Sequence, residues 1–381
     1  MPTWLIFFIV LSVLVLVHEL GHFAAAIIFG IRVEEFAIGL PFTRPLFKIK
    51  THGTQYAIYP LLFGGFVKLL GEDGPPDMKS SRGNDFWSRS LLQRILVVGA
   101  GVIMNTVLAL FGFYVLYSVV GVPLSNTSKV TVADVAANTP AAKAGLKTGD
   151  RITKIEGKEV FSVDEFGTLV KSWAGVPVNL TVERGETIPL FEGIVEKNTT
   201  TSVITLVPRK NPPKDQGALG VTISDYPYVN TKKCDVSDLK CALAIAGAGI
   251  KSTRVWVGRV FDGLSMIGKS IMAGKVPQEV SGPVAIYQVT GIIAAEGFLP
   301  LIEFVAVLSV NLAVFNFLPI PALDGGRLLF FYLEGIFRKR IPAEIEQRVN
   351  SIGMVALLIL MALVSLQDVW RLGVFEKFFG K

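Results

Sequence analysis

Four stretches of the chain are apolar for long enough to cross a lipid bilayer, which takes about 20 residues of helix. They lie at about 4–29, 91–120, 298–318 and 351–370. Between the second and third stretches, runs such as VTVADV and VNLTVERG alternate apolar and polar positions, which is typical of strands with one buried face. The pattern predicts an α-helical polytopic membrane protein with four transmembrane helices and an inserted β-rich domain.

The pattern also gives a domain order along the chain. The predicted segments are residues 1–30 as transmembrane helix 1, 31–90 as a cytoplasmic-side loop, 91–120 as transmembrane helix 2, 124–210 as the β-rich domain, 211–297 as a linker with an amphipathic helix, 298–327 as transmembrane helix 3, and 351–370 as transmembrane helix 4. The N-terminus lacks the basic region of a cleavable signal peptide, so the first stretch is expected to be retained.

Two further segments have a membrane-related pattern without being long apolar helices. Residues 56–70 are apolar but interrupted by Pro60 and Gly64, which predicts a membrane-associated β-hairpin or a re-entrant segment. Residues 250–272 place apolar side chains at helical spacing among basic ones. They are interpreted as a helix lying on the membrane surface, or alternatively as a helix packed on the β-rich domain.

Composition and charge support a membrane protein and give its orientation. Hydrophobic residues make up 51% of the chain and charged residues only 18%, where about 25% is ordinary for soluble proteins. The net charge is +6, but no basic run interleaved with aromatic residues suggests nucleic-acid binding. Basic residues gather at 31–90 and between the last two spans, so both loops are expected in the cytoplasm. The β-rich domain and both termini would then be extracytoplasmic.

Two cysteines, Cys234 and Cys241, lie in one polar stretch. They could form a disulfide if this stretch faces an oxidising compartment, and two free thiols are equally compatible with the sequence.

The first apolar stretch contains the sequence HELGH at residues 18–22. Residues four apart share one face of a helix, so His18 and His22 can bind one zinc ion while Glu19 removes a proton from water held there. A chance pattern of hydrogen-bonded histidines is the alternative. However, ionisable residues inside a span are costly, and a metal site accounts for them. The chain's third histidine, His52, stands beside Gly53 and is interpreted as a solvated loop residue.

A third zinc ligand is expected in the motif NFLPIPALDGGR at 316–327. Its prolines favour extended backbone, and the glycine pair permits a tight turn after Asp324. An ordinary Asp-Gly turn at a helix end is the alternative reading of that acid. The predicted topology brings Asp324 and HELGH to the same depth, which favours Asp324 as a ligand. Asn316 is a candidate for binding substrate or an oxyanion.

Other polar residues of the spans receive weaker interpretations. Asn311 is expected to be structural. Glu303 lies near the outer end of its span, where solvation at the interface is the default expectation. Asn105 lies among small residues in GAGVIMN and could face the site, but close helix packing explains those small residues equally well.

HELGH in the first span together with NFLPIPALDGG in the third resembles the site-2 protease family of intramembrane zinc metalloproteases. VADVAANTPAAKAGLKTGDRITKIEGKEV resembles a PDZ domain, and GGFVKLLGED and SGPVAI resemble segments of the branch similar to the regulator of sigma E protease. The resemblance covers nearly the whole chain. The chain shows one PDZ-like region where some members of the family carry two in tandem. It also has Val102 after Gly101 where a proline is frequent, and Arg327 where some relatives have histidine.

The resemblance implies a zinc enzyme in the cell inner membrane that cleaves single-span membrane proteins in regulated intramembrane proteolysis. His18, His22 and Asp324 would hold zinc, and Glu19 would act as general base. Asn316, Pro319 and Pro321 would place the substrate, such as an anti-sigma factor or a remnant signal peptide. Two alternatives are a non-catalytic membrane scaffold that uses its PDZ-like domain, and a zinc transporter. The sequence does not predict an oligomeric state.

Overall fold

Four helices in the described part of the chain are long and apolar enough to cross a membrane, and they confirm the predicted spans. They are α1 (Thr3–Ile28), α2 (Leu91–Val120), α7 (Phe298–Phe317) and α9 (Ala343–Arg371). The third helix ends ten residues before the predicted limit of 327, because the two prolines of the motif that follows cannot continue it. A separate helix, α8 (Asp324–Phe337), begins at the aspartate itself.

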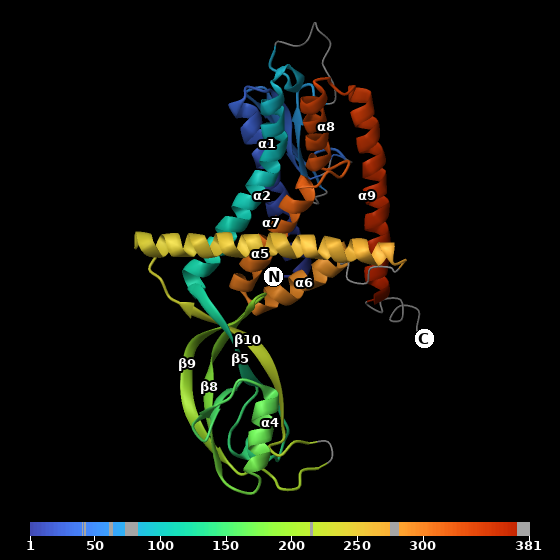
Figure 1. Ribbon diagram of the computed structural model, residues 1–381. Coiled ribbons are helices and arrows are strands. Elements are labelled where there is room, and N and C mark those ends of the chain that lie inside the picture. The colour runs from blue at the N-terminus through green and yellow to red at the C-terminus, as the bar shows by residue number, and fades with distance from the viewer. Residues whose placement is uncertain are drawn as a thin grey trace. The chain divides into compact units, whose positions relative to one another are not determined.

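The computed structural model describes residues 1–39, 41, 43–60, 64–72, 83–213, 216–274 and 282–371. Two units are separately compact (Figure 1): Met1–Val115 with Gly249–Lys381, and Leu116–Ala248. The first unit contains the four-stranded sheet, α1, α7, α8, α9, most of α2 and α6 (Pro283–Glu296). The second unit contains the β-rich domain.

A four-stranded sheet follows α1, and it corrects the prediction of a hairpin over 56–70. Its order is β2-β3-β1-β4, and its strands are β1 (Val33–Ile38), β2 (Phe47–Thr51), β3 (Thr54–Ile58) and β4 (Gly65–Leu69). β3 and β4 do not pair with each other, because β1 lies between them, parallel to β3 and antiparallel to β4. Residues 61–63 of the predicted hairpin lie outside the described residues.

The hairpin of this sheet joins β2 and β3 through His52 and Gly53. Both residues have positive φ, 49° and 89°, as in the two-residue turn that matches the twist of antiparallel strands. His52 is exposed there, at the tip of the turn. β4 is an edge strand on the other side of the sheet, since its only partner among the described strands is β1.

The β-rich domain is a six-stranded sheet in the order β5-β10-β9-β8-β6-β7. Its elements are β5 (Val122–Val135), α3 (Pro140–Lys143), β6 (Arg151–Ile155), β7 (Lys158–Glu159), α4 (Val163–Ser172), β8 (Val178–Leu190), β9 (Gly193–Leu206) and β10 (Val221–Lys232). The predicted end of the domain at residue 210 is wrong, because β10 pairs with β5 along its whole length.

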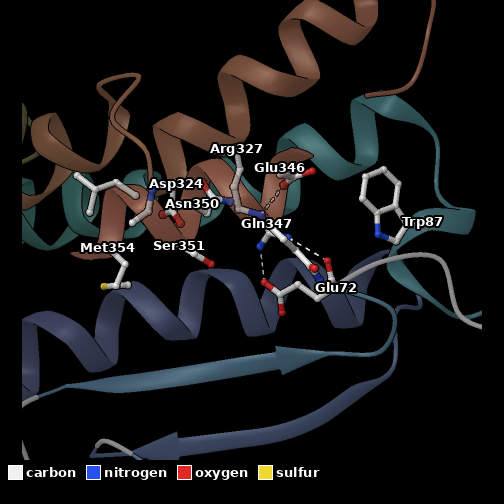
Figure 2. Close-up of a pocket in the computed structure, with 11 residues that line it drawn as sticks. Glu72, Trp87, Asp324, Arg327, Glu346, Gln347, Asn350, Ser351 and Met354 are labelled. Atoms are coloured by element: carbon white, nitrogen blue, oxygen red, sulfur yellow. Dashed lines mark hydrogen bonds and ion pairs between the residues drawn. The ribbon is translucent and has the colours of Figure 1, made fainter. Parts of the chain in front are cut away.

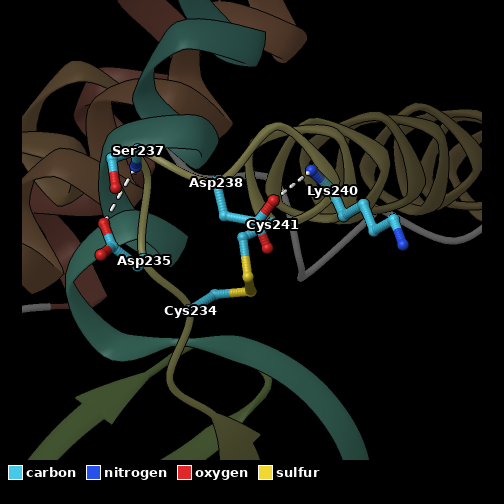
Figure 3. Close-up of a disulfide and its surroundings, with 6 residues drawn as sticks. All are labelled: Cys234, Asp235, Ser237, Asp238, Lys240 and Cys241. Atoms are coloured by element: carbon cyan, nitrogen blue, oxygen red, sulfur yellow. Dashed lines mark hydrogen bonds between the residues drawn. A yellow bond between two sulfur atoms is a disulfide. The ribbon is translucent and has the colours of Figure 1, made fainter.

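The predicted amphipathic helix at 250–272 is part of a longer helix, α5 (Leu239–Met272). Cys234, in the loop before α5, forms a disulfide with Cys241, in the first turn of α5, and their Cα atoms lie 5.4 Å apart (Figure 3). In the same loop, the carboxylates of Asp235 and Asp238 accept hydrogen bonds from backbone N–H groups two residues further on. The disulfide resolves the alternative that the sequence left open.

α9 is attached to its unit near its two ends. At its C-terminal end, Asp368 accepts hydrogen bonds from the backbone N–H groups of Gly282 and Ala285, at 3.0 Å each, and so caps α6. At its N-terminal end, Asn350 Oδ1 accepts a hydrogen bond from the backbone N–H of Ala322. No described residue in the most apolar window of α9 is buried inside the protein, which is the pattern of a helix that faces lipid.

Candidate metal centre

Three side chains from two distant segments converge inside the first unit. His18 Nε2 lies 3.2 Å from His22 Nε2 and 3.0 Å from Asp324 Oδ2, and His22 Nε2 lies 3.3 Å from that oxygen. The histidines are one turn apart on α1, so their rings share a face. Asp324 reaches them as the first residue of α8.

The geometry of this cluster fits a zinc ion. Ligand atoms about 2.0–2.1 Å from a tetrahedral zinc lie roughly 3.3–3.4 Å from one another. The three measured separations, 3.0–3.3 Å, are close to that value. Among the described residues, these three form the group of metal-ligating side chains, with all three ligand atoms within 4.8 Å of one another. Two imidazoles and a carboxylate are a donor set that catalytic zinc sites use, and they leave a position open.

Local backbone geometry explains how Asp324 reaches the histidines. The chain leaves α7 in an extended conformation at Leu318, and Ala322 has a φ of 73°, which is uncommon for a residue with a side chain. The expected tight turn at Gly325 and Gly326 is wrong, since both lie in the first turn of α8. Instead, the glycines permit close approach: a Cβ would lie 2.0 Å from Leu318 O at Gly325, and 2.5 Å from Ile320 O at Gly326.

A cavity of about 570 Å³ surrounds the cluster. His18, Glu19, His22, Asn316 and Asp324 line it together. Pro319 and Pro321 are not among the described residues that line it, and they shape the extended segment instead. The cavity is also bordered by β4, through Gly65–Val67 and Leu69. An edge strand therefore runs beside the proposed base and the metal ligands.

A second cavity, of about 650 Å³, shares Asp324, Glu72 and Arg327 with the first. Figure 2 shows Arg327 extending from α8 between Glu72, just beyond β4, and Glu346, at the start of α9. Burial opposes the charge of Arg327, yet the carboxylates of Glu72 and Glu346 raise the pKa of its guanidinium above the ordinary value. This ion-pair network joins three elements beside the cluster.

Asn105 is the residue at the site that the sequence left undecided. Its side chain is fully buried, and its Nδ2 lies 3.2 Å from His18 Nδ1. The alternative interpretation, close helix packing at the small residues, also holds in part, because Gly101, one turn earlier, lies against both histidine rings. The spacing Gly-x-x-x-Asn on an apolar helix was the available signal. No sequence signal pointed to Glu72, which lies three residues beyond the end of β4 at Leu69.

Two other polar residues of α7 have clear surroundings. Asn311 donates a hydrogen bond to Val307 O within its own helix, at 3.0 Å, as expected for a structural amide. The expectation that Glu303 is solvated at the interface is wrong, since only 2% of this residue is exposed. Its neighbours on the sequence gave no indication of this, because burial depends on the helices packed around it.

A model of peptidase family M50 matches residues 6–360. The chain belongs to peptidase family M50. The predicted membership of the site-2 protease family is thereby confirmed. Because this M50 peptidase carries the family match over nearly its whole length, the alternative of a scaffold without enzymatic activity loses its basis.

Three relatives of this chain are named as metalloproteases. A "putative zinc metalloprotease" of Clostridium perfringens is 38% identical over 361 residues, which are 94% of this chain and 96% of the relative. One of Agrobacterium fabrum is 31% identical over 382 positions, with 95% and 94% covered. A chloroplastic "probable membrane metalloprotease" of Arabidopsis thaliana is 32% identical over 371 residues, with 95% and 79% covered. The M50 peptidase is a zinc metalloprotease and a membrane protein.

Proposed function

We propose that this M50 peptidase cleaves single-span membrane proteins within or near their transmembrane segments. The observation that carries the proposal is the cavity in which His18, His22, Asp324 and Glu19 meet, because residues of all four candidate spans, α1, α2, α7 and α9, line it. A peptidase whose reacting groups lie between membrane helices is suited to substrates that arrive in the bilayer. Anti-sigma factors and remnant signal peptides are the substrate classes that fit this description.

The proposed chemistry uses Glu19 as general base. His18, His22 and Asp324 would hold the zinc ion, which would supply a Lewis acid to activate water and polarise a carbonyl. Glu19 lines the same cavity from the turn of α1 between the two histidines, within reach of such a water. It would take the water's proton and later pass it to the leaving amine. The polar cavity beside Asp324, lined by Asn350 and Ser351, supports water access.

The proposed substrate contacts come from β4 and Asn316. An edge strand offers unpaired backbone groups to an extended chain, which can add to the sheet as a further strand. Because β4 borders the cavity, a strand added there would pass beside Glu19. Asn316 would donate its amide hydrogen bond to the substrate backbone or to the oxyanion. Pro319 and Pro321 would act by holding the chain that carries Asp324.

The β-rich domain is proposed to be a PDZ-like domain on the extracytoplasmic side of the cell inner membrane. The basic loops on the opposite side and the disulfide at Cys234 support this orientation, since disulfides persist in oxidising compartments. A mostly apolar groove of about 530 Å³ lies between α4 and the start of β10, with Lys171 and Arg209 among its lining residues. These features support binding of a free carboxyl end with apolar side chains.

Substitution Glu19→Gln tests the catalytic proposal. The variant should lose cleavage of a model single-span substrate by about 10²- to 10⁴-fold, the usual contribution of a general base. It should still bind one zinc, because Glu19 is not part of the ligand cluster. The measurement is cleavage by purified protein in detergent, with zinc counted by elemental analysis. A chelator should stop the parent protein, and added zinc should restore it.

Equal cleavage by parent and variant would overturn the role of Glu19. Zinc binding without cleavage by the parent, over a panel of single-span substrates, would contradict the proposed substrate class.

The apolar groove beside α4 of the β-rich domain has its own test. A peptide with a free apolar carboxyl end should bind the full chain at least tenfold more tightly than its carboxamide, measured by fluorescence anisotropy. Equal binding of both peptides would exclude recognition of carboxyl ends.

A further inference from the structure

Asn105 occupies a point where three spans meet. Its backbone oxygen accepts a hydrogen bond from Ser309 Oγ on α7, at 2.9 Å. Its side chain extends the other way, to His18 on α1. Asn105, His18 and Ser309 are all buried. The backbone of Asn105 is therefore tied to α7, while its side-chain amide faces the His18 imidazole from α2.

Zinc binding by His18 determines which atom of the Asn105 amide, nitrogen or oxygen, can form a hydrogen bond with the imidazole. His18 turns its Nε2 toward His22 and Asp324, so a zinc ion there takes that nitrogen. A neutral imidazole that binds metal through Nε2 carries its proton on Nδ1 and donates from it. The amide nitrogen of Asn105 cannot accept that proton, whereas its oxygen can.

The amide oxygen is available for this role. Asn105 Oδ1 is buried and has no hydrogen-bond partner among the residues that the structure describes. A half-turn about the Cβ–Cγ direction of χ2 exchanges the oxygen and nitrogen of an amide at almost unchanged shape. After that half-turn, the unpartnered Oδ1 has a hydrogen-bond donor, and His18 Nδ1–H has an acceptor.

We propose that Asn105 is a positioning residue whose Oδ1 accepts a hydrogen bond from His18 Nδ1–H and holds that ring in the tautomer and orientation that bind zinc. This inference rests on the proposed assignment of His18 as a zinc ligand. His22 is held by the same helix in another way, since its Nδ1 donates to the backbone oxygen of Val97, at 2.9 Å. The two histidines thus depend on α2 for their second contacts, one through a side chain and one through the main chain.

The test compares zinc affinities of the full-length protein in detergent, measured by competition with a coloured chelator. Asn105→Leu should bind zinc about 10- to 100-fold more weakly than the parent, which is the usual effect of losing such a partner. Asn105→Asp should retain affinity within a few-fold, because a carboxylate accepts the same hydrogen bond. The matched control is Asn311→Leu, which removes an amide that bonds only inside α7 and should leave affinity unchanged.

Cobalt substitution supplies a readout that folding alone would not change. The visible d–d bands of the cobalt form should shift in Asn105→Leu and stay close to the parent in Asn311→Leu. Unchanged zinc affinity in Asn105→Leu would overturn the proposal. So would equal losses in Asn105→Leu and Asn311→Leu, or in Asn105→Leu and Asn105→Asp, because these would indicate packing alone. A parent protein that binds no zinc, or whose zinc survives His18→Ala, would instead overturn the site assignment itself.

Discussion

Single atoms on α2 decide whether the metal centre can form. A Cβ at Gly101 would lie 2.5 Å from His18 Cε1 and 2.6 Å from His22 Nε2, closer than non-bonded atoms approach. A Cβ at Gly21 of α1 would lie 2.4 Å from Ala100 O. The backbone of α2 at Gly101 therefore packs against the two histidine rings, and the backbone of α1 at Gly21 packs against the backbone of α2. Because these glycines have no side chains, there is space for the imidazoles.

Gly101→Ala should disrupt the zinc site while leaving the fold largely intact. Overpacking by one methyl group costs about 1–3 kcal/mol, which corresponds to roughly tenfold to hundredfold weaker zinc binding if the strain falls on the histidines. Zinc affinity in detergent is the measurement. Gly99→Ala is the matched control, because no described residue, apart from its chain neighbours and the adjacent backbone of its own helix, lies within 4 Å of the Cβ it would add. An affinity for zinc as high in Gly101→Ala as in Gly99→Ala would contradict this account of the glycine.

At the scale of elements, α9 and the four-stranded sheet are joined to α8 by one guanidinium. Arg327 contacts Glu72 after β4 and Glu346 in the first turn of α9. Its ring neighbour Phe86 adds a cation–π contact, with 5.6 Å between the guanidinium carbon and the ring centroid. Arg327 and Glu72 are partly buried and Glu346 is buried, so breaking this network is costly, because the carboxylates left behind would be uncompensated charges.

Arg327→Leu should therefore loosen the segments on both sides of the cavity. We expect faster backbone hydrogen exchange at residues 66–72 and 343–350, and an unfolding free energy lower by about 3–5 kcal/mol. Hydrogen exchange with mass spectrometry on the full chain is the measurement. Arg340→Leu is the control, because this exposed arginine lies 3.6 Å from Glu334 and should contribute at most about 1 kcal/mol. Unchanged exchange at both segments would mean that Arg327 does not hold them together.

The sequence predicted the elements that depend on local pattern and missed those that depend on distant partners. Apolar runs of 20 residues or more fix a membrane helix by themselves, so the spans were found. The pairing of β4 with β1 instead of β3 joins residues that lie far apart in the sequence, from Ile38 with Gly65 to Val33 with Leu69, and no local signal specifies it. Likewise, HELGH and the LDGG motif carried the candidate ligands, whereas Asn105 could be assigned only when α1 was packed against α2.

At the scale of the whole molecule, charge and covalent bonding point to one orientation. Under the proposed topology the basic loops would lie in the cytoplasm, and the disulfide that follows the β-rich domain would lie in the oxidising compartment where disulfides persist. The disulfide closes a short loop between residues seven apart, which contributes about 2.5 kcal/mol in the chain-entropy model. Its contribution is small enough that the domain should remain folded after reduction.

Thiol labelling in intact cells tests this orientation. Because the chain has only two cysteines, a membrane-impermeant maleimide should label the parent protein only after a reductant is added. The control is Arg340→Cys, whose new thiol should stay unlabelled until the cells are permeabilised. Labelling of Arg340→Cys in intact cells would reverse the predicted topology, and labelling of the parent without reductant would contradict the disulfide.

The edge strand beside the cavity has a consequence for substrate choice. Pairing with β4 uses the substrate's main chain, which is the same for every amino acid, so selectivity would come from how readily a transmembrane helix unravels. Glycine or proline near the cleavage point would then favour a substrate more than any particular side chain there. In a model span, replacing one central leucine by glycine should speed cleavage, whereas exchanging leucine for valine should change it little. The enzyme would distinguish its substrates by their local helix stability.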